Sequence, residues 1–293
     1  MRPKALLHVH QTPDGVHFGA WSLFEIKTAF QPLFRFRGGK VEIGAFECLV
    51  RPFRNGQAIS PGQFFPLVPG QDKVEVEALM RAVHLMNAGA FLEPAAMVFV
   101  NFDPSLFVDR ILIDRALSDL RAVLGEAGID AARLVCEMTE QKTASDDLLF
   151  DFVNALRRQG YRIAVDDYGS DDSDMERIRR LKPDIIKFDA HWINRLMDSS
   201  AGFALLEAMV RRFRDENIAT VFEGIETHWQ LVLAEKANVD FVQGFVLAKP
   251  ELAPGNFSQF RGSDETIRAP FRPQEPIQIP SRAGRTFGRK GAA

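Results

Sequence analysis

Cysteine is scarce in this sequence of 293 residues, which has only Cys48 and Cys136. Each adjoins an acidic residue inside a strand-like run, so the alternation of side chains predicts that both point outward, beneath the helices. We expect buried free thiols rather than a disulfide, a state that suits a reducing cytoplasm. The sequence also shows no cluster of histidine and cysteine of the kind that zinc prefers.

Long apolar runs are lacking as well. No stretch approaches the roughly 18–20 residues of a membrane-spanning helix, and Ala5–Val9 is too short for the core of a signal peptide. The formal net charge of −3 provides no overall attraction to nucleic acid or to an anionic membrane. We therefore expect no nucleic-acid partner and no membrane span, and an anionic substrate would have to be met by local cations.

The composition is otherwise ordinary for a globular protein, with 46% hydrophobic and 26% charged residues. The length suffices for one large α/β barrel or for two smaller domains. We predict an N-terminal lead-in over residues 1–24, a barrel domain over 25–255, and a tail over 256–293. Proline and arginine are frequent in that tail, which we expect to be disordered.

Six short apolar runs each end in a polar side chain. They are Ile43–Glu47, Met97–Asn101, Leu134–Glu137, Ile163–Asp167, Ile185–Lys187 and Thr220–Glu223. Each has the length and the β-branched content of a buried strand, and most are separated by helix-length segments. Parallel strands that bring polar groups to one common rim are how a β/α barrel builds an active site, so the pattern predicts this fold.

The first part of the barrel should be irregular. Phe30–Phe36 and Lys40–Phe53 resemble strands, and the short link Arg37-Gly38-Gly39 between them demands an antiparallel hairpin rather than a parallel crossover. The preceding segment, Ala20–Ala29, is a candidate for a short helix. Further helices are expected over Val74–Asn87, Asp109–Ala127, Asp146–Gln159, Ser173–Leu181, Ala204–Glu216 and His228–Lys236, and a last strand over Phe241–Leu247.

The polar residues at the strand ends are hard oxygen donors, which suit Mg²⁺ or Mn²⁺. Five of them are carboxylates, and their crowding at one rim would cause strong repulsion unless more than one divalent cation were bound. The candidate metal ligands are Glu47, Asn101, Glu137, Asp166, Asp167 and Glu223. Any one of these acids alone is more often a helix cap or a loop residue, and Asn101 alone a turn residue, so the prediction depends on their joint occurrence.

Two adjacent acids end one strand, Asp166 and Asp167, and alternation points them to different sides. One of them can bridge two ions roughly 3.5–4 Å apart while the other binds a single ion, an arrangement that clamps a phosphodiester. Lys187 can hold the nucleophilic water or the phosphate, and Arg51 can reach a phosphate oxygen. The spacing thus predicts a metal-dependent barrel enzyme without naming its substrate.

At these residues the chain resembles the EAL domain, the cyclic di-GMP phosphodiesterase family. The likeness runs from Phe30 to Pro250, about three quarters of the chain. The motifs that carry it are Phe30-Gln31-Pro32, Glu47-Cys48-Leu49 with Arg51, Ile59-Ser60-Pro61, Val100-Asn101, Glu137-Met138-Thr139-Glu140, Asp166-Asp167-Tyr168-Gly169, Ile186-Lys187-Phe188-Asp189, Glu223-Gly224-Ile225-Glu226-Thr227 and Gln243-Gly244-Phe245. The naming Glu-Ala-Leu of the family has Cys48 in place of its alanine.

The resemblance implies a TIM-like (β/α)8 barrel with its first strand antiparallel, and hydrolysis of cyclic di-GMP to linear pGpG, which lowers this second messenger. Two Mg²⁺ or Mn²⁺ ions would be bound by the six candidate ligands. Catalytic roles would fall to Glu47, to Lys187 beside the attacking water, and to Glu223 as a general base. The resemblance further implies substrate contacts by Leu49, Arg51 and Gln243, loop-bracing roles for Glu140 and Glu226, and a homodimer.

Two segments depart from the family pattern. After Asp167 the family has Phe-Gly-Thr-Gly-Tyr-Ser-Ser, whereas this chain has three acids in that stretch, Asp171, Asp172 and Asp174. These acids can cap the helix that follows, or they can oppose an anionic substrate. The alternative function is therefore that of a catalytically weak or inactive cyclic di-GMP receptor that acts through a regulatory protein partner. The second departure follows Lys187, where Trp192 is expected to fill the core at the phenylalanine position of the family.

Overall fold

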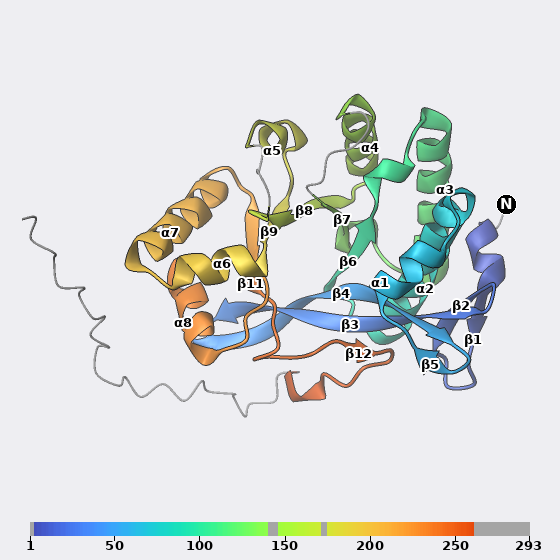
Figure 1. Cartoon of the computed structure of the whole chain (residues 1–293), viewed down its shortest axis with the longest axis horizontal. Helices are drawn as coiled ribbons and strands as arrows, with labels where there is room; N and C mark the ends of the chain where they lie inside the picture. Colours follow the sequence, from blue (N-terminus) through green and yellow to red (C-terminus); the bar gives the residue numbers. More distant parts are fainter. Residues whose placement is uncertain (1–2, 140–145, 171–174, 261–293) are drawn as a thin grey trace, which may run out of the picture.

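The computed structural model describes residues 3–139, 146–170 and 175–260, and eight strands within these ranges close into a barrel (Figure 1). The ring closes because β3 pairs with both β4 and β11. The other neighbours along the ring pair in parallel. The barrel strands are β3 (Phe24–Arg37), β4 (Lys40–Arg54), β6 (Met97–Phe102), β7 (Leu134–Thr139), β8 (Arg162–Tyr168), β9 (Ile185–Phe188), β10 (Ala219–Phe222) and β11 (Phe241–Val242).

The antiparallel strand is β3, as the short glycine link predicted. Its pairing with β4 runs from Arg37 opposite Lys40 to Phe24 opposite Arg54, and the turn glycines Gly38 and Gly39 both have positive φ. Both strands are longer than the parallel strands of the barrel, so they cross the molecule as a long ribbon in Figure 1. The TIM-like barrel with an antiparallel first strand is therefore confirmed.

Helices cover the outside of the barrel. They are α1 (Pro61–Phe64), α2 (Lys73–Phe91), α3 (Arg110–Ala127), α4 (Asp146–Arg158), α5 (Met175–Leu181), α6 (Ala190–Met197), α7 (Ser200–Asp215) and α8 (His228–Ala237), with short 3-10 turns η2 (Phe65–Leu67), η3 (Gly70–Asp72), η4 (Pro104–Leu106) and η5 (Ala131–Arg133). Side-chain caps define several starts, such as Asp109 on the backbone N–H of Leu112. No helix within the described ranges is long and apolar enough to cross a membrane.

The N-terminal segment extends the sheet instead of forming the helix expected over Ala20–Ala29. It folds as η1 (Lys4–His8), β1 (Val9–Gln11) and β2 (His17–Trp21), and β2 pairs antiparallel with the start of β3. The helix prediction was wrong because burial alternates in this stretch, with Phe24, Ile26 and Thr28 buried, which is the period of a strand. Pairing with β4 on the other side then holds the segment extended.

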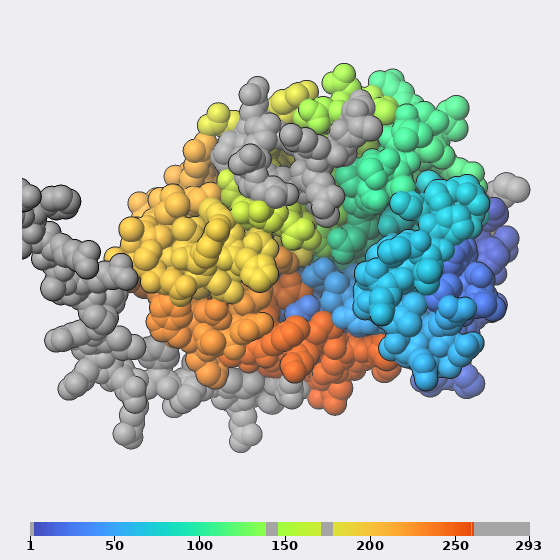
Figure 2. All heavy atoms as spheres, in the orientation of Figure 1, coloured from blue at the N-terminus to red at the C-terminus, as the bar shows by residue number. Residues whose placement is uncertain are grey.

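The described C-terminal end packs back on the antiparallel ribbon. The short strand β12 (Glu251–Leu252) pairs with β3, and η6 (Ser258–Phe260) follows it. Phe257 and Phe260 pack their rings against Phe46 and Phe34. In Figure 2 this segment lies along the lower edge of the face shown, next to the blue surface of the ribbon. Residues 261–293 of the predicted tail lie outside the described residues.

The apolar core has two layers that the alternation of the strands keeps apart. Inside the barrel lie Leu33, Ala45, Phe99, Val135, Ala164, Ile185 and Val221. The larger outer layer fills the space between strands and helices, and it contains Cys48 and Cys136. Both cysteines are free and buried, as predicted, and burial raises the pKa of each thiol, so neither ionises at neutral pH.

Candidate metal centre

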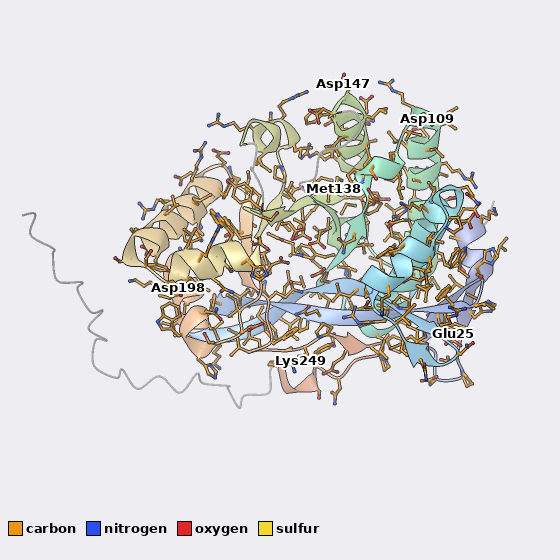
Figure 3. The ribbon with its side chains drawn as sticks, viewed as in Figure 1. Glu25, Asp109, Met138, Asp147, Asp198 and Lys249 are labelled. Carbon is orange, nitrogen blue, oxygen red and sulfur yellow. The ribbon has the colours of Figure 1, made fainter. Side chains whose placement is uncertain are left out.

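A layer of polar side chains lies directly above the apolar layer inside the barrel. On each strand the polar residue is two positions from the apolar residue, so the two side chains project from the same inward face. The layer consists of Gln31, Glu47, Asn101, Glu137, Asp166, Lys187, Glu223 and Gln243. Met138, the neighbour of Glu137 on β7, lies near the middle of the molecule in Figure 3. The strand ends thus bring the predicted residues to one level of the barrel.

Gln31 is the member of this layer that was not predicted. It lies on β3 directly opposite Glu47 in the ribbon register. Because β3 runs antiparallel, its inward residue above Leu33 precedes that leucine in the sequence instead of following it. Counting back two residues from Leu33 would have identified Gln31 once the hairpin had been predicted.

Lys187 is at the centre of the site and is 1% exposed. Its Nζ lies 2.6 Å from Glu223 Oε1, 3.3 Å from Asp166 Oδ1 and 3.4 Å from Glu47 Oε2, and it also forms an ion pair with Glu137. Burial by itself lowers the pKa of a lysine, but these carboxylates together raise the pKa of Lys187 well above its usual value. The side chain is therefore an ammonium ion at neutral pH.

Glu137 is fully buried, and neither of its oxygens has an aligned hydrogen-bond partner. Its only described partner is the Lys187 ammonium, which lies in ion-pair contact with Oε1. Burial raises the pKa of Glu137 well above its usual range, and the charges of Glu47 and Asp166 add to the effect. Burial likewise raises the pKa of Glu223 to about 8. Buried carboxylate oxygens without partners are what a cation site would satisfy.

The two aspartates at the end of β8 do not point to different sides as alternation predicted. The pairing of β8 with β9 shifts between Val165 and Tyr168, and Asp167 adopts a left-handed backbone with φ of 58°. The backbone N–H of Asp167 donates to Asp166 Oδ1 at 2.9 Å, which stabilises this turn. This irregular strand end turns both carboxylates toward Glu223.

Two groups of carboxylates are close enough to share a cation. One contains Glu47, Glu137 and Glu223, and the other contains Asp166, Asp167 and Glu223, with ligand atoms within 4.8 Å of one another in each. Glu223 belongs to both groups. Which carboxylate would bridge two ions stays a prediction. All the donors are hard oxygens, which suit Mg²⁺ or Mn²⁺, and the five carboxylates exceed the single ammonium in charge.

The predicted substrate-binding residues lie on the ribbon and beside the carboxylates. Gln243 follows β11 and donates from Nε2 to Glu47 Oε2 at 2.8 Å. Leu49 and Arg51 continue β4 beyond Glu47, on the same face of the strand. Arg51 is half-buried, and its Nη1 donates to the carbonyl of Val50 at 2.8 Å.

Among the predicted metal-ligating and loop-bracing residues that the structure describes, Asn101 and Glu226 have no described contact with this cluster. Asn101 lies opposite Glu137 in the register of β6 and β7, and its side chain is exposed at the rim. Glu226 is exposed before α8, where its backbone N–H donates to Gln230 Oε1. Glu140 lies outside the described residues, as do Asp171, Asp172 and Asp174. The loop-bracing roles therefore stay predictions.

The fold and the site together define a class of protein. Its members are TIM-like barrels with a rim of hard oxygen donors around one lysine. Comparison with known families gives the particular member of that class. The EAL domain model matches residues 20–250, and the chain belongs to the EAL domain family.

Relatives of this chain carry names from cyclic di-GMP metabolism. The chain is 29% identical over 245 residues to the probable cyclic di-GMP phosphodiesterase PdeG of Escherichia coli, covering 82% of this chain and 47% of PdeG. It is 26% identical over 232 residues to the cyclic di-GMP phosphodiesterase NbdA of Pseudomonas aeruginosa, covering 77% of this chain and 29% of NbdA. The chain thus spans less than half the length of either relative.

Solved structures show the same barrel with ligand bound. Klebsiella pneumoniae BlrP1, in its complex with manganese and cyclic di-GMP, superposes with a TM-score of 0.69 at 26% identity, covering 78% of this chain and 56% of BlrP1. The PaMucR phosphodiesterase in complex with c-di-GMP gives a TM-score of 0.67 at 25% identity, covering 78% of this chain and 92% of that one.

Proposed function

We propose that this chain hydrolyses one phosphodiester bond of cyclic di-GMP to give linear pGpG, with the help of two divalent cations. The observation that carries the proposal is the convergence of Glu47, Glu137, Asp166 and Glu223 around Lys187 at one level of the barrel. Membership of the EAL domain family and relatives named as cyclic di-GMP phosphodiesterases support the choice of substrate.

The residues present fit a pair of Mg²⁺ or Mn²⁺ ions, since Glu137 Oε2 is buried without a described partner and Glu223 belongs to two groups of carboxylates. Glu47, Asn101, Glu137, Asp166, Asp167 and Glu223 would hold the ions. When bound, such ions neutralise phosphate charge and activate water for in-line attack.

The side chains around this centre divide into distinct roles. Lys187, in contact with four of these carboxylates, is placed to act as a donor that positions the attacking water or a phosphate oxygen. Glu223 is the proposed acceptor of the proton from that water. Gln243 orients the Glu47 carboxylate through its hydrogen bond. Leu49 and Arg51, on the same face of β4, are placed to contact a base and a phosphate of the substrate.

A turnover assay with Mn²⁺ or Mg²⁺ tests this function. The full chain is expected to convert cyclic di-GMP to pGpG, and Glu47→Ala is expected to lower turnover by about 100-fold or more because a cation ligand is lost. Glu42→Ala is the matched control, because Glu42 lies on the same strand but pairs with Arg35 and Arg37 near the opposite end. Absence of pGpG, with no effect of Glu47→Ala on metal binding, would rule the proposal out.

The second candidate is a receptor that binds cyclic di-GMP without turnover and acts through a protein partner. The three acids of the segment after Ser170 favour it, because anions near a phosphate site oppose substrate. Calorimetry distinguishes the two functions: binding with metal present but without pGpG production supports the receptor. If Asp171→Gly with Asp172→Tyr restores turnover to an inactive wild type, the acidic segment is the cause.

A further inference from the structure

A cavity of ≈190 Å³ lies on the outside of the barrel, away from the metal centre. Its walls come from η1, the end of β2, and one face each of α2 and α3. In Figure 1 the N-terminal helix lies beside these two helices at the right of the molecule. None of the candidate metal ligands lines the cavity. The cavity is therefore separate from the metal centre.

The space exists because the two helices touch at one end and carry small residues at the other. Near their C-terminal ends, a Cβ on Gly89 would lie 2.0 Å from the backbone oxygen of Ala127, so the backbones are in close contact there. Toward their N-terminal ends the cavity walls include Ala78 and Ala82 of α2 and Ala116 of α3. These alanines leave unfilled volume where leucine-sized side chains would close the helix pair.

The cavity is lined mainly by apolar side chains. Leu79 and Leu85 of α2 and Leu120 and Val123 of α3 form much of the wall, and Trp21 of β2 also lines it. The apolar part of this lining offers water few hydrogen-bond partners. An apolar ligand, in contrast, gains by leaving water.

The charged groups at the cavity are matched with opposite charges. Lys4 Nζ and Glu75 Oε1 form an ion pair at 2.5 Å that joins η1 to α2 on the exposed side. Arg81 lines the cavity and pairs with Glu77 at 2.7 Å. The remaining charged lining residues, Arg115 and Asp119, have opposite signs. With the charges matched in this way, the lining favours an uncharged ligand over an anion or a cation.

We propose that this cavity is a binding site for a small, uncharged, mainly apolar molecule of one or two fused rings. An apolar cavity of about 150 Å³ stays dry and accepts benzene, so the volume here suits a slightly larger ring system. Such a molecule would pack between the alanines of α2 and α3. The Lys4–Glu75 ion pair lies on the exposed side, where a ligand would enter.

A bound molecule would stabilise the helices that form the walls. The opposite face of α2 is already fastened to β3, because His84 Nδ1 lies 2.8 Å from Thr28 Oγ1, and Asn87 Nδ2 donates to the same oxygen at 3.1 Å. Filling the cavity would therefore slow local opening of α2 and α3 together. This effect separates binding in the cavity from binding elsewhere on the protein.

Titration of the full chain with indole tests the proposal. Saturating indole is expected to raise the Tm by about 2–4 °C. It should also slow amide hydrogen exchange in α2 and α3 more than in α7 and α8. No saturable rise in Tm up to the solubility limit of indole, or equal protection of all four helices, would overturn the site.

Cavity-filling variants locate the binding. Ala78→Leu and Ala116→Leu, made separately, are each expected to abolish the response to indole, whereas Ala208→Leu on the exposed side of α7 should leave it unchanged. Should one filling variant fail to fold, the other still decides the matter, and Ala78→Met is a milder substitute. A filled and folded variant that responds to indole as the wild type does would show that the cavity is not the site.

Discussion

Lys187 places one ammonium ion among four carboxylates of the site. Replacing it by methionine, Lys187→Met, leaves those carboxylates without their internal cation. We expect turnover to fall by about 100-fold or more, and the metal-free protein to lose about 3 kcal/mol of stability. Unfolding by urea with and without Mn²⁺ measures the second effect, which should shrink when Mn²⁺ replaces the missing charge.

The control for this prediction is Lys40→Met, since Lys40 is exposed at the hairpin turn and should change neither quantity. A Lys187→Met protein that keeps both its turnover and its metal-free stability would show that the ammonium does not hold the cluster together.

His84 makes the stability of the protein depend on pH. Burial, with the nearby charges of Arg81 and Arg51, lowers its pKa to about 3. The unfolded chain takes up a proton on this residue below about pH 6.5, whereas the folded protein does so only near pH 3. Stability is therefore lost as the pH falls from about 6.5 toward 3. At neutral pH the ring is uncharged, and it lies within hydrogen-bond distance of Thr28.

The variant His84→Gln removes this titration while keeping an acceptor near Thr28. We expect the wild type to lose about 2 kcal/mol more stability than the variant between pH 7 and pH 5. Urea unfolding at pH 7, 6 and 5 measures the difference. Parallel pH profiles for the two proteins would show that His84 titrates normally in the folded state.

At the scale of elements, the end of β8 depends on the helix that follows β9. Gly169 has φ of 97°, and a Cβ there would lie 2.6 Å from the indole of Trp192. That indole stacks on Phe188 and meets Tyr168 edge-on. The indole of Trp192, the residue predicted to fill the core, thus supports the turn that carries Asp166 and Asp167.

Gly169→Ala is therefore expected to disturb the cation site. The added methyl group conflicts with the indole, and the left-handed backbone is strained, so we expect Mn²⁺ affinity to fall by about 10-fold. Gly56→Ala is the matched control, with a similar φ of 77° and open space around the added Cβ. Calorimetric titration with Mn²⁺ compares the two, and equal affinities would refute the role of the Trp192 contact. Adding Trp192→Ala to Gly169→Ala should recover part of the loss.

Much of the fold could be predicted from the sequence, as particular elements show. The two-glycine link demanded the hairpin of β3 and β4, and the helices from α2 to α4 begin and end within a few residues of their expected bounds. The helix α6 was not predicted, and the last strand is only Phe241–Val242 instead of reaching Leu247. It stops there because the chain turns at Gly244, where a Cβ would lie 2.0 Å from the backbone oxygen of Ile225. Such contacts between distant segments leave no pattern in the local sequence from which they could be predicted.

At the scale of the whole molecule, folding and cation binding should be linked. Burial raises the pKa values of Glu137 and Glu223, and the charges of the neighbouring carboxylates add to the effect, so the metal-free barrel contains an unfavourable cluster. We expect Mn²⁺ at about 100 times its Kd to add about 2.7 kcal/mol of stability, and a chelator to remove it. Thermal unfolding with Mn²⁺ and with EDTA measures this. Glu137→Gln should reduce the gain, and an equal Tm in both buffers would contradict the linkage.

A homodimer, a regulatory partner and a cytoplasmic location remain predictions for the whole protein, as do the boundaries at residues 24 and 255. The matched residues cover only 47% of PdeG and 29% of NbdA. Sedimentation of the full chain with and without Mn²⁺ would establish the oligomeric state.

The sequence by itself determined which residues are available and on which face of each strand they stand. Hydrophobic alternation along each strand sets that face, because side chains project to opposite sides at every step. Only the tertiary structure decided that both aspartates turn inward and that Glu223 lies close to both groups of carboxylates. Those outcomes depend on a shifted strand pairing and on the closure of the ring. These are relations between segments far apart in the chain, and no local pattern encodes them.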